Sequence, residues 1–312
     1  MYVPYLHGRQ EESLALAAIA VDLASHGRVV PLIEPVRLNS QLHKKLTILR
    51  DAGANVMVIA NPTRGEITSA RRQRDVLTLL APDFADVAHV RPVFRESEEQ
   101  GLSELRAFLV DYRDRPIGIL LTTSLISEVD LAAAVVGRDY VLIFAPSVSG
   151  MGYSTHIPLN STIDLGERFR GRTPNAQFVG LPDESFGNDL TTWRSAGRAG
   201  FADYTVLAPT YAEGGSGAVA LVLHLTYMDG ASLRVQHFAS AAGARGDNPP
   251  KWAELLQELE DTVTAHPARF QATAGLASFR SQYVSRAYTS PGSSKRQQII
   301  HHIQTVAARM TP

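Results

Sequence analysis

The chain contains no cysteine, which excludes disulfide bonds, thiol nucleophiles and metal sites with cysteine ligands. It also lacks an excess of charge, because 30 lysines and arginines face 31 aspartates and glutamates. This balance creates no long-range field toward nucleic acid, so net charge does not support direct nucleic-acid binding. Apolar runs long enough to cross a bilayer are missing, and the first residues lack the layout of a signal peptide. We therefore expect a cytoplasmic protein without a membrane partner.

Apolar segments of strand length alternate with amphipathic helical segments through the first half of the chain. With 312 residues, of which 45% are hydrophobic, the chain can bury a sizeable core. Near-continuous apolar strands separated by helices are typical of a parallel sheet that is covered on both faces. The expected strands are 2–6, 28–34, 55–60, 88–94, 117–121 and 140–144, and the expected helices are 10–25, 40–53, 68–80, 102–112 and 129–136.

Six such units, beginning at residue 2, favour a closed (β/α)8 barrel of the TIM-barrel type. The alternative is an open doubly wound sheet. Its usual Gly-x-Gly-x-x-Gly motif is replaced after the first strand by Leu6-His-Gly-Arg-Gln-Glu.

The second half of the chain is less regular. Segments 176–181 and 202–207 are expected to be strands seven and eight, with a helix over 191–199 between them. Strands 218–227 and 232–238 flank Asp229-Gly230, which predicts a hairpin that closes or decorates the barrel. Helices are expected over 250–265 and 295–310. We therefore expect a barrel domain over 1–240 with a loop insertion near 146–175, and a helical extension over 241–312 packed on the barrel.

Three glycines in four residues, Gly214, Gly215 and Gly217, lie between two expected strands late in the chain. Without a Cβ, backbone N–H groups of such a run can converge on an anion, and barrel enzymes often bind phosphate at this stage of the chain. The alternative is a flexible connecting loop. The run lacks the Gly-Lys-Ser/Thr ending of a P-loop.

Polar side chains recur where the expected strands end, which is where barrel proteins carry functional residues. Arg9 and Glu12 follow the first strand, Glu34 ends the second, and Asn61 and Arg64 follow the third. We expect Arg9 and Arg64 to bind an anion with forked hydrogen bonds, with Asn61 contributing to ligand binding. Glu34 and Glu12 are the candidate catalytic residues, Glu34 orienting a ligand or acting as a general base. The structural alternative is a salt bridge from Glu34 to Arg9 or Arg64 that braces the rim.

Two histidines, His224 and His237, lie on the two strands of the expected hairpin and are predicted to approach each other. With Asp203 they would bind a metal or transfer protons. The alternative is a pair of half-buried histidines hydrogen-bonded to the backbone. His7-Gly8 is similar to the start of glycerophosphodiesterase barrels, but the second strand ends in Glu34-Pro-Val and lacks their second carboxylate.

Several short blocks together resemble the Beta-protein-like family of phage and bacterial proteins, in its bacterial branch. The blocks are Pro4-Tyr-Leu-His-Gly-Arg-Gln-Glu-Glu-Ser-Leu-Ala-Leu, Val30-Pro-Leu-Ile-Glu-Pro, Phe201-Ala-Asp-Tyr, the glycine run, His224-Leu-Thr-Tyr, Gln236-His-Phe-Ala-Ser and 296–302. The resemblance implies a barrel-like fold and a setting in mobile-element or phage-defence loci, without an established reaction. Arg9, Glu12 and Glu34 fit the family pattern, whereas His7 stands where a basic residue is expected.

Our hypothesis is a component of a bacterial defence or conflict system whose barrel mouth recognises a polar, anionic ligand such as a nucleotide, phosphorylated metabolite or peptide. One alternative is a non-catalytic interaction protein that regulates a partner such as a nuclease, and another is a metal-dependent phosphodiesterase. The sequence specifies no metal, cofactor or reaction, and it leaves open whether the protein is an enzyme.

Overall fold

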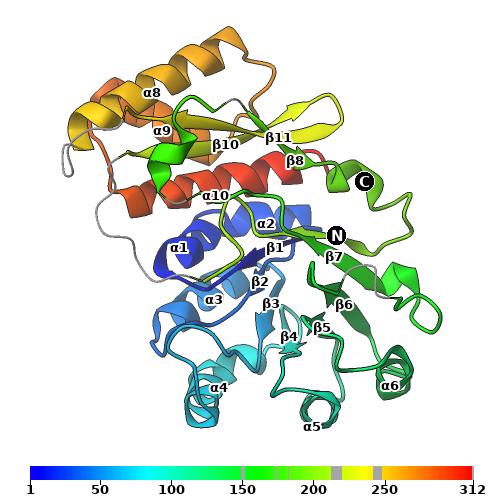
Figure 1. Cartoon of the computed structure of the whole chain (residues 1–312). Coiled ribbons are helices and arrows are strands. Elements are labelled where there is room, and N and C mark those ends of the chain that lie inside the picture. The colour runs from blue at the N-terminus through cyan, green and yellow to red at the C-terminus, as the bar shows by residue number, and fades with distance from the viewer. Residues whose placement is uncertain (149–151, 173, 182, 212–219, 242–247, 311–312) are drawn as a thin grey trace. The chain divides into compact units, whose positions relative to one another are not determined.

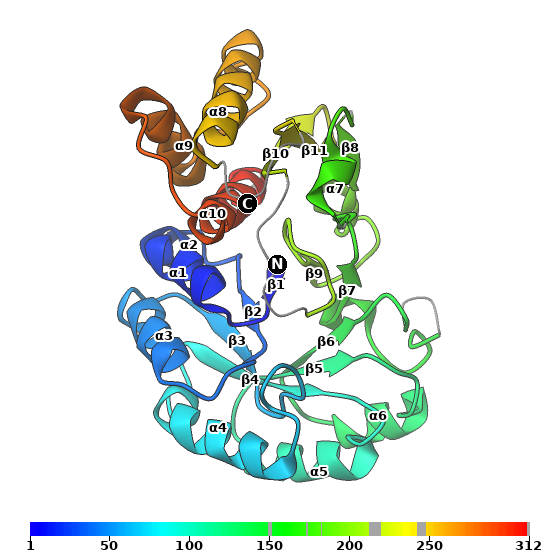
Figure 2. The same ribbon diagram turned by 60° about the vertical axis from the view of Figure 1, so that its left-hand side comes forward.

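The computed structural model describes residues 1–148, 152–172, 174–181, 183–211, 220–241 and 248–310. The chain divides into two compact units, each of which is described by itself (Figures 1 and 2). The first unit comprises Met1–Glu167 and Thr192–Tyr204, and the second comprises Arg168–Thr191 and Thr205–Pro312.

Eight parallel strands form a closed barrel in the first unit, in the order β1-β2-β3-β4-β5-β6-β7-β9. The barrel closes where β9 pairs in parallel with β1, with Phe201 opposite Tyr2. The predicted (β/α)8 barrel is therefore confirmed, and the open sheet is excluded. Its strands are β1 (Tyr2–Leu6), β2 (Leu32–Ile33), β3 (Val56–Ile59), β4 (Val90–Arg95), β5 (Ile117–Leu121), β6 (Tyr140–Phe144), β7 (Thr162–Gly166) and β9 (Gly200–Asp203).

Helices connect the early strands and surround the barrel (Figure 2). Local signals fix their ends, since the hydroxyls of Ser69 and Ser127 accept N–H bonds at the starts of α4 and α6, and Gly27 ends α2 in the left-handed conformation. They are α1 (Gln10–Ala18), α2 (Ala20–His26), α3 (Gln41–Asp51), α4 (Ala70–Phe84), α5 (Leu102–Asp111) and α6 (Glu128–Ala134), with η1 (Leu159–Ser161) before β7. The short helix α7 (Asp189–Thr192) begins in the second unit, before the chain returns to the barrel at β9. Over the described residues, no helix is both long and apolar enough to cross a membrane.

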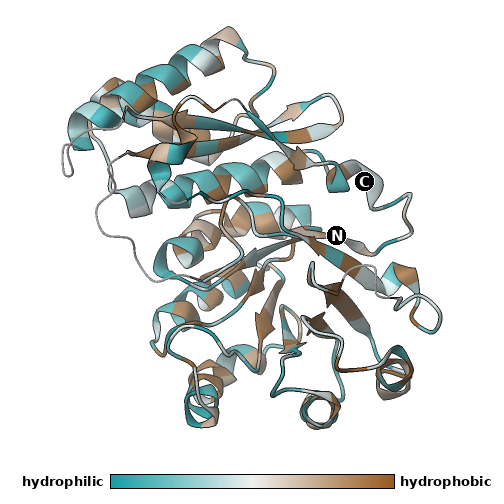
Figure 3. Ribbon diagram, in the orientation of Figure 1, coloured by the Kyte–Doolittle hydropathy of each residue, from teal (hydrophilic) through white to brown (hydrophobic). Residues whose placement is uncertain are grey.

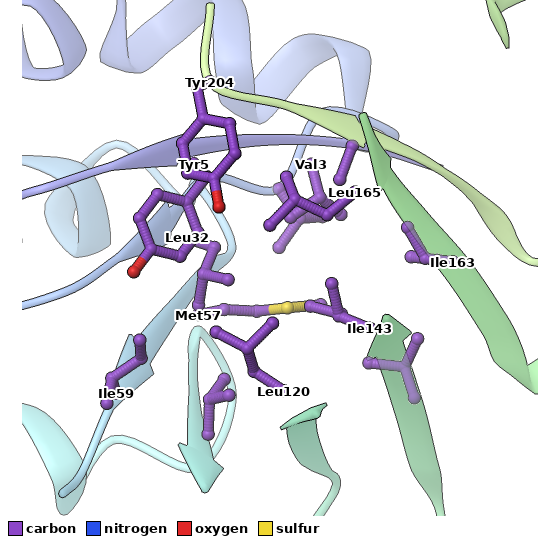
Figure 4. Packing of buried hydrophobic residues seen from close by; sticks show 14 residues of the cluster. Val3, Tyr5, Leu32, Met57, Ile59, Leu120, Ile143, Ile163, Leu165 and Tyr204 are labelled. Atoms are coloured by element: carbon purple, nitrogen blue, oxygen red, sulfur yellow. The ribbon is translucent and has the colours of Figure 1, made fainter. Parts of the chain in front are cut away.

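The barrel interior is a packed apolar core rather than a channel. Successive side chains of a strand point to opposite faces, so alternate residues such as Val3 and Tyr5 turn inward, and several strands, such as β5 and β6, are hydrophobic along most of their length (Figure 3). The inward side chains meet around Met57 (Figure 4). The cluster is Val3, Tyr5, Val30, Leu32, Met57, Ile59, Val93, Leu120, Val141, Ile143, Ile163, Leu165, Ala202 and Tyr204.

The second unit is an antiparallel sheet with its own helices. Strands β10 (Val222–Asp229), β11 (Ser232–Ala239) and β8 (Glu184–Gly187) pair in the order β10-β11-β8. Alternate residues of β10, such as Leu223 and Leu225, share a core with Trp252 and Phe279. The remaining elements are η2 (Asn175–Phe178), α8 (Asn248–Ala265), α9 (Ala274–Ser285) and α10 (Pro291–Ala307).

Strand seven of the barrel is β7, which lies inside the segment expected to be a loop insertion, whereas the predicted strand 176–181 overlaps η2. The physical reason is that β7 is not continuously apolar. Ile163 and Leu165 enter the core, but Asp164 between them forms an ion pair with Arg198 at 3.1 Å.

The predicted hairpin is present, with Asp229 opposite Ser232 and Gly230 at φ 60°. It pairs with β8 instead of closing the barrel. Because its apolar face shares a core with α8 and α9, residues 205–240 belong to the second unit. The unit boundary therefore differs from the expected division at 240 and 241.

Closure of the barrel depends on Gly200, where an added Cβ would lie 1.9 Å from the backbone oxygen of Met1. Backbone atoms cannot move aside without breaking the β9–β1 ladder, so we expect Gly200→Ala to destabilise the protein by about 1–3 kcal/mol in urea unfolding. Gly101→Ala is the control, because its Cβ would meet only a side-chain oxygen at 3.9 Å. Equal stabilities of the two variants would contradict this account of closure.

Candidate functional site

Side chains from several strand ends meet at the carboxyl end of the barrel. Because all barrel strands are parallel, their carboxyl ends open at the same rim. We call this set the mouth cluster. It consists of Tyr5, His7, Glu34, Arg64, Arg95 and Tyr204.

Glu34 is the centre of the mouth cluster. Its side chain is fully buried, and the Tyr5 hydroxyl donates a hydrogen bond to its Oε2 atom. Arg64 Nε lies 3.3 Å from Oε2, and Arg95 Nε lies 3.7 Å from Oε1. A buried carboxylate is tolerated only when opposite charges and donors surround it, and two guanidiniums and a phenol meet that need here. The predicted ion pair with Arg64 is present, whereas Arg9 bonds elsewhere.

Two buried atoms of this cluster have no hydrogen-bond partner among the described residues. They are Glu34 Oε1 and Arg95 Nε. Their separation of 3.7 Å is longer than a hydrogen bond. The cluster therefore contains one buried acceptor and one buried donor that are paired by charge but form no hydrogen bond.

His7 is buried and neutral. Its Nε2 atom lies 3.0 Å from Arg64 Nη1, and a guanidinium is only a donor, so Nε2 accepts and Nδ1 carries the proton. Burial, reinforced by the charge of Arg64, lowers the pKa of His7 to about 3. His7 thus fixes the direction of Arg64 without adding charge.

Two tyrosines form the boundary between the mouth cluster and the apolar core. The rings of Tyr5 and Tyr204 lie 4.9 Å apart and side by side in Figure 4. Burial, with Glu34 adjacent, raises the pKa of Tyr5 well above its usual value, and burial raises the pKa of Tyr204 to about 12. Both phenols therefore remain donors at neutral pH. The next residue, Thr205, has φ 55°, a conformation that costs a β-branched residue about 1–3 kcal/mol.

Asn61 positions Arg95. Its Nδ2 atom donates to the Arg95 carbonyl and its Oδ1 atom accepts from the Arg95 N–H, both at 2.7 Å. The guanidinium of Arg95 also donates to Thr63 Oγ1 at 2.6 Å. The side-chain amide of Asn61, which we predicted to contribute to ligand binding, forms two hydrogen bonds with the backbone of Arg95, as a neighbouring strand would.

Glu12 and Arg9 stabilise the turn after β1. Glu12 is buried, accepts the His7 N–H at 2.6 Å and lies 3.9 Å from Arg9 Nε. The predicted catalytic carboxylate of Glu12 therefore serves the backbone, because a buried N–H needs an acceptor. The side chain of Arg9 is 30% exposed and lies beside this turn.

Gly65 allows the segment that carries Arg64 to approach the chain after β2. It has φ 64°, and an added Cβ would lie 2.3 Å from the Val36 carbonyl oxygen. The N–H of Glu66 donates to the same carbonyl at 2.9 Å. This close backbone approach helps to place Arg64 near Glu34.

A small cavity of about 160 Å³ is lined in part by Asp164 and Arg198, and another of about 110 Å³ lies beside the turn after β1. Gly8 and Ser13 line the second cavity together with the cations Arg37 and Lys45. No acidic side chain is among its lining residues in the described structure. The charge of this cavity is therefore positive.

The remaining predicted site residues are not members of the mouth cluster. His224 and His237 belong to the second unit, where they are directly opposite each other and their Nδ1 atoms are 2.9 Å apart. Asp203 belongs to the first unit and accepts a hydrogen bond from Tyr2 at 2.8 Å. Gly214, Gly215 and Gly217 lie outside the described residues. Over the described part of the chain, no three histidines or carboxylates gather with the geometry of a metal site.

Tyr5, Arg95 and Tyr204 were not predicted to be site residues. Arg95 directly follows the expected strand 88–94 and ends β4, so the strand-end rule that selected Glu34 and Arg64 also applies to it. Tyr5 and Tyr204 lie within segments that were expected to be strands. The role of the Tyr5 hydroxyl becomes visible because β1 pairs with β2, directly before Glu34.

Comparison with protein-family models and with curated proteins gives no match to this chain. Among solved structures, it is similar to a Coccidioides immitis protein assigned to the dihydrodipicolinate synthase family. The TM-score is 0.40 at 10% identity, and the match covers 98% of this chain and 83% of that protein.

The depressed pKa of His7 predicts a pH dependence of stability. An unfolded His7 regains a pKa of about 6.5 and binds a proton that the folded state excludes until about pH 3. The stabilising contribution is therefore present above about pH 6.5 and is lost as the pH falls toward 3. We expect the advantage of the wild type over His7→Gln in urea unfolding to shrink between pH 7 and pH 4.5. His26→Gln, which replaces an exposed histidine, is the control for losing a histidine without burial. A difference between wild type and His7→Gln that stays constant with pH would contradict the assignment of His7 as a buried, neutral histidine.

Proposed function

We propose that the mouth cluster recognises a polar ligand that carries negative charge, such as a nucleotide, a phosphorylated metabolite or a phosphorylated or acidic peptide. The observation that carries the proposal is the pair of partnerless buried atoms on Glu34 and Arg95. A buried donor or acceptor without a partner costs about 1–3 kcal/mol, so a ligand that satisfies both atoms regains this energy.

The cations around the site can attract an anion. Three guanidiniums, those of Arg9, Arg64 and Arg95, face the two carboxylates of Glu12 and Glu34, and His7 adds no charge. Glu167, which acts on Tyr204, is a further acid near the cluster, so the charges there balance. The neighbouring cavity adds two further cations without an acid among its described lining residues.

The geometry assigns complementary roles. Arg95 Nε would donate to a ligand oxygen, and Arg64 would strengthen the same contact as a charge-assisted donor. Glu34 Oε1 would accept from a ligand hydroxyl or amine and thereby orient it. Asn61 and His7 act as positioning residues, because they hold Arg95 and Arg64 respectively.

Within this proposal, the biological setting is a component of a bacterial defence or conflict system, as the resemblance to the Beta-protein-like family implies. The mouth cluster surrounds Glu34 with guanidiniums and a phenol, which suits ligand recognition better than divalent metal binding. This environment argues against a metal-dependent phosphodiesterase at this position. No lysine lies on a barrel strand, so imine formation with a carbonyl substrate is not available there.

The alternative of a non-catalytic interaction protein, regulating a partner such as a nuclease, is favoured by one surface. Leu125, Val129 and Val136 are exposed at 59%, 60% and 77%; Val129 lies on α6, and the other two lie in the chain just before and just after this helix. Exposed apolar side chains of this kind can pack against a protein partner.

Native mass spectrometry of the protein purified from its own host tests the proposal. We expect a bound anionic ligand, with Arg95→Gln and Arg64→Gln each weakening its retention about tenfold or more, the effect of losing a charge-assisted hydrogen bond. Arg138→Gln is the control, because this half-buried arginine donates only to the Leu109 and Tyr112 carbonyls. A ligand-free mass with a stoichiometric protein partner would favour the interaction protein instead, as would a ligand that both mouth variants retain.

A further inference from the structure

The second unit contains a chain of charged and polar side chains that the mouth cluster does not use. Glu184 of β8 lies opposite Val235 of β11, and His237 of β11 lies opposite His224 of β10. The sheet therefore places one carboxylate and two imidazoles on adjacent strands.

Four side chains form one continuous hydrogen-bonded series. Arg172 donates from both terminal nitrogens to the two oxygens of Glu184, each at 2.7 Å. Glu184 Oε2 lies 3.0 Å from His237 Nε2, and His237 Nδ1 lies 2.9 Å from His224 Nδ1. We call Glu184, His237 and His224 the relay.

The order of contacts fixes the proton on each ring. An ionised carboxylate only accepts, so His237 Nε2 carries a proton and the Nδ1 atom of the neutral ring is a bare acceptor. His224 Nδ1 must therefore donate to it. The remaining nitrogen, His224 Nε2, is then left with an unprotonated lone pair.

The surroundings stabilise this neutral arrangement. The rings of Phe169 and Phe178 lie 4.8 Å and 4.7 Å from the ring of His224. Burial lowers the pKa of His224 well below its usual value, and burial also lowers the pKa of His237, with Glu184 opposing the shift. The hydrogen bonds from Arg172 lower the pKa of Glu184 to about 2, so the carboxylate is ionised at neutral pH.

His224 is held in position by its backbone and remains partly accessible. Gln298 Oε1 accepts the backbone N–H of His224 at 2.9 Å, which fixes β10 at this point. The surface of His224 is mostly covered but not fully buried, whereas the side chain of His237 is buried, with 3% of its surface exposed. The exposed ammonium of Lys295 is close enough for its charge to lower the pKa of His224.

From this geometry we infer a second functional site, in which the relay presents His224 Nε2 as a proton acceptor for the hydroxyl group of an anionic phosphate-type ligand. The P–OH group of a phosphate monoanion, or a hydroxyl beside a phosphate, would donate to Nε2, and Lys295 would balance the negative charge. Glu184 and His237 are positioning residues, because they reach the ligand only through His224.

Proton transfer through the relay conserves charge and atoms. The ligand hydroxyl gives its proton to His224 Nε2, and the O–H electrons remain on the ligand oxygen. The proton on His224 Nδ1 moves to His237 Nδ1, so the positive charge comes to lie on His237 beside the Glu184 carboxylate. The ligand oxygen leaves this step as an anion, and no oxidant, reductant or further reactant is required.

Nitrogen-15 NMR of the full chain with labelled histidines tests the proton assignment. We expect His237 to be protonated on Nε2 and His224 on Nδ1 at pH 7. The reverse assignment on His224, with Nε2 protonated, would overturn the inference because no base would then be presented.

Reaction with diethyl pyrocarbonate, read by peptide mass spectrometry, tests the exposed base. We expect His224 to be modified, and Glu184→Gln to slow the modification about tenfold, the scale found when an orienting partner is lost. Glu260→Gln is the matched control. Glu260 belongs to the same unit and accepts two hydrogen bonds from Arg280, as Glu184 does from Arg172, but these bonds do not involve a histidine. An unreactive His224 contradicts the inference, and so does an equal rate in Glu184→Gln.

Inorganic phosphate is the ligand probe. Compared with sodium chloride of equal ionic strength, it should protect His224 from modification, and Lys295→Gln should abolish the protection. Absence of protection in the wild type would overturn the ligand class. The mouth-cluster arginines are not involved in this readout, so failure here and failure of the barrel proposal are distinguishable.

Discussion

The burial of the Glu34 carboxylate is the interaction on which the carboxyl end of the barrel depends. A fully buried carboxylate is costly unless opposite charges and donors surround it, and here they come from β1, β4 and the segment after β3. Each partner has its own support, because His7 fixes Arg64 and Asn61 fixes the backbone of Arg95. Ligand recognition would therefore follow from the same contacts that make Glu34 tolerable.

The two units use a related arrangement for different chemistry. In each unit, arginine side chains pair with a glutamate, and that glutamate accepts a proton-bearing hydrogen bond from a neighbouring side chain. Glu34 accepts from the phenol of Tyr5, and its other oxygen has no hydrogen-bond partner among the described residues. Glu184 accepts from His237, and the effect passes through that ring to His224. The first arrangement suits charge recognition, whereas the second suits proton transfer.

The sequence predicted the barrel because its early strands are apolar on both faces, which local periodicity reveals. It failed at β7, where outward-facing Asp164 interrupts the apolar run, and it placed the hairpin without its partner β8, because strand pairing is a long-range contact. Of the mouth, strand ends indicated Glu34 and Arg64. The importance of Tyr5 could not be predicted, because an inward tyrosine looks like core until its hydrogen-bond partner after the adjacent strand β2 is known.

A crystal structure of the protein purified from its own host gives the most direct test of the account. The account predicts electron density for a non-protein group within about 3.2 Å of both Arg95 Nε and Glu34 Oε1, the limit of an ordinary hydrogen bond. Density that instead shows these two atoms bonded directly to each other, with the mouth closed by the protein's own side chains, would contradict ligand recognition at the barrel mouth.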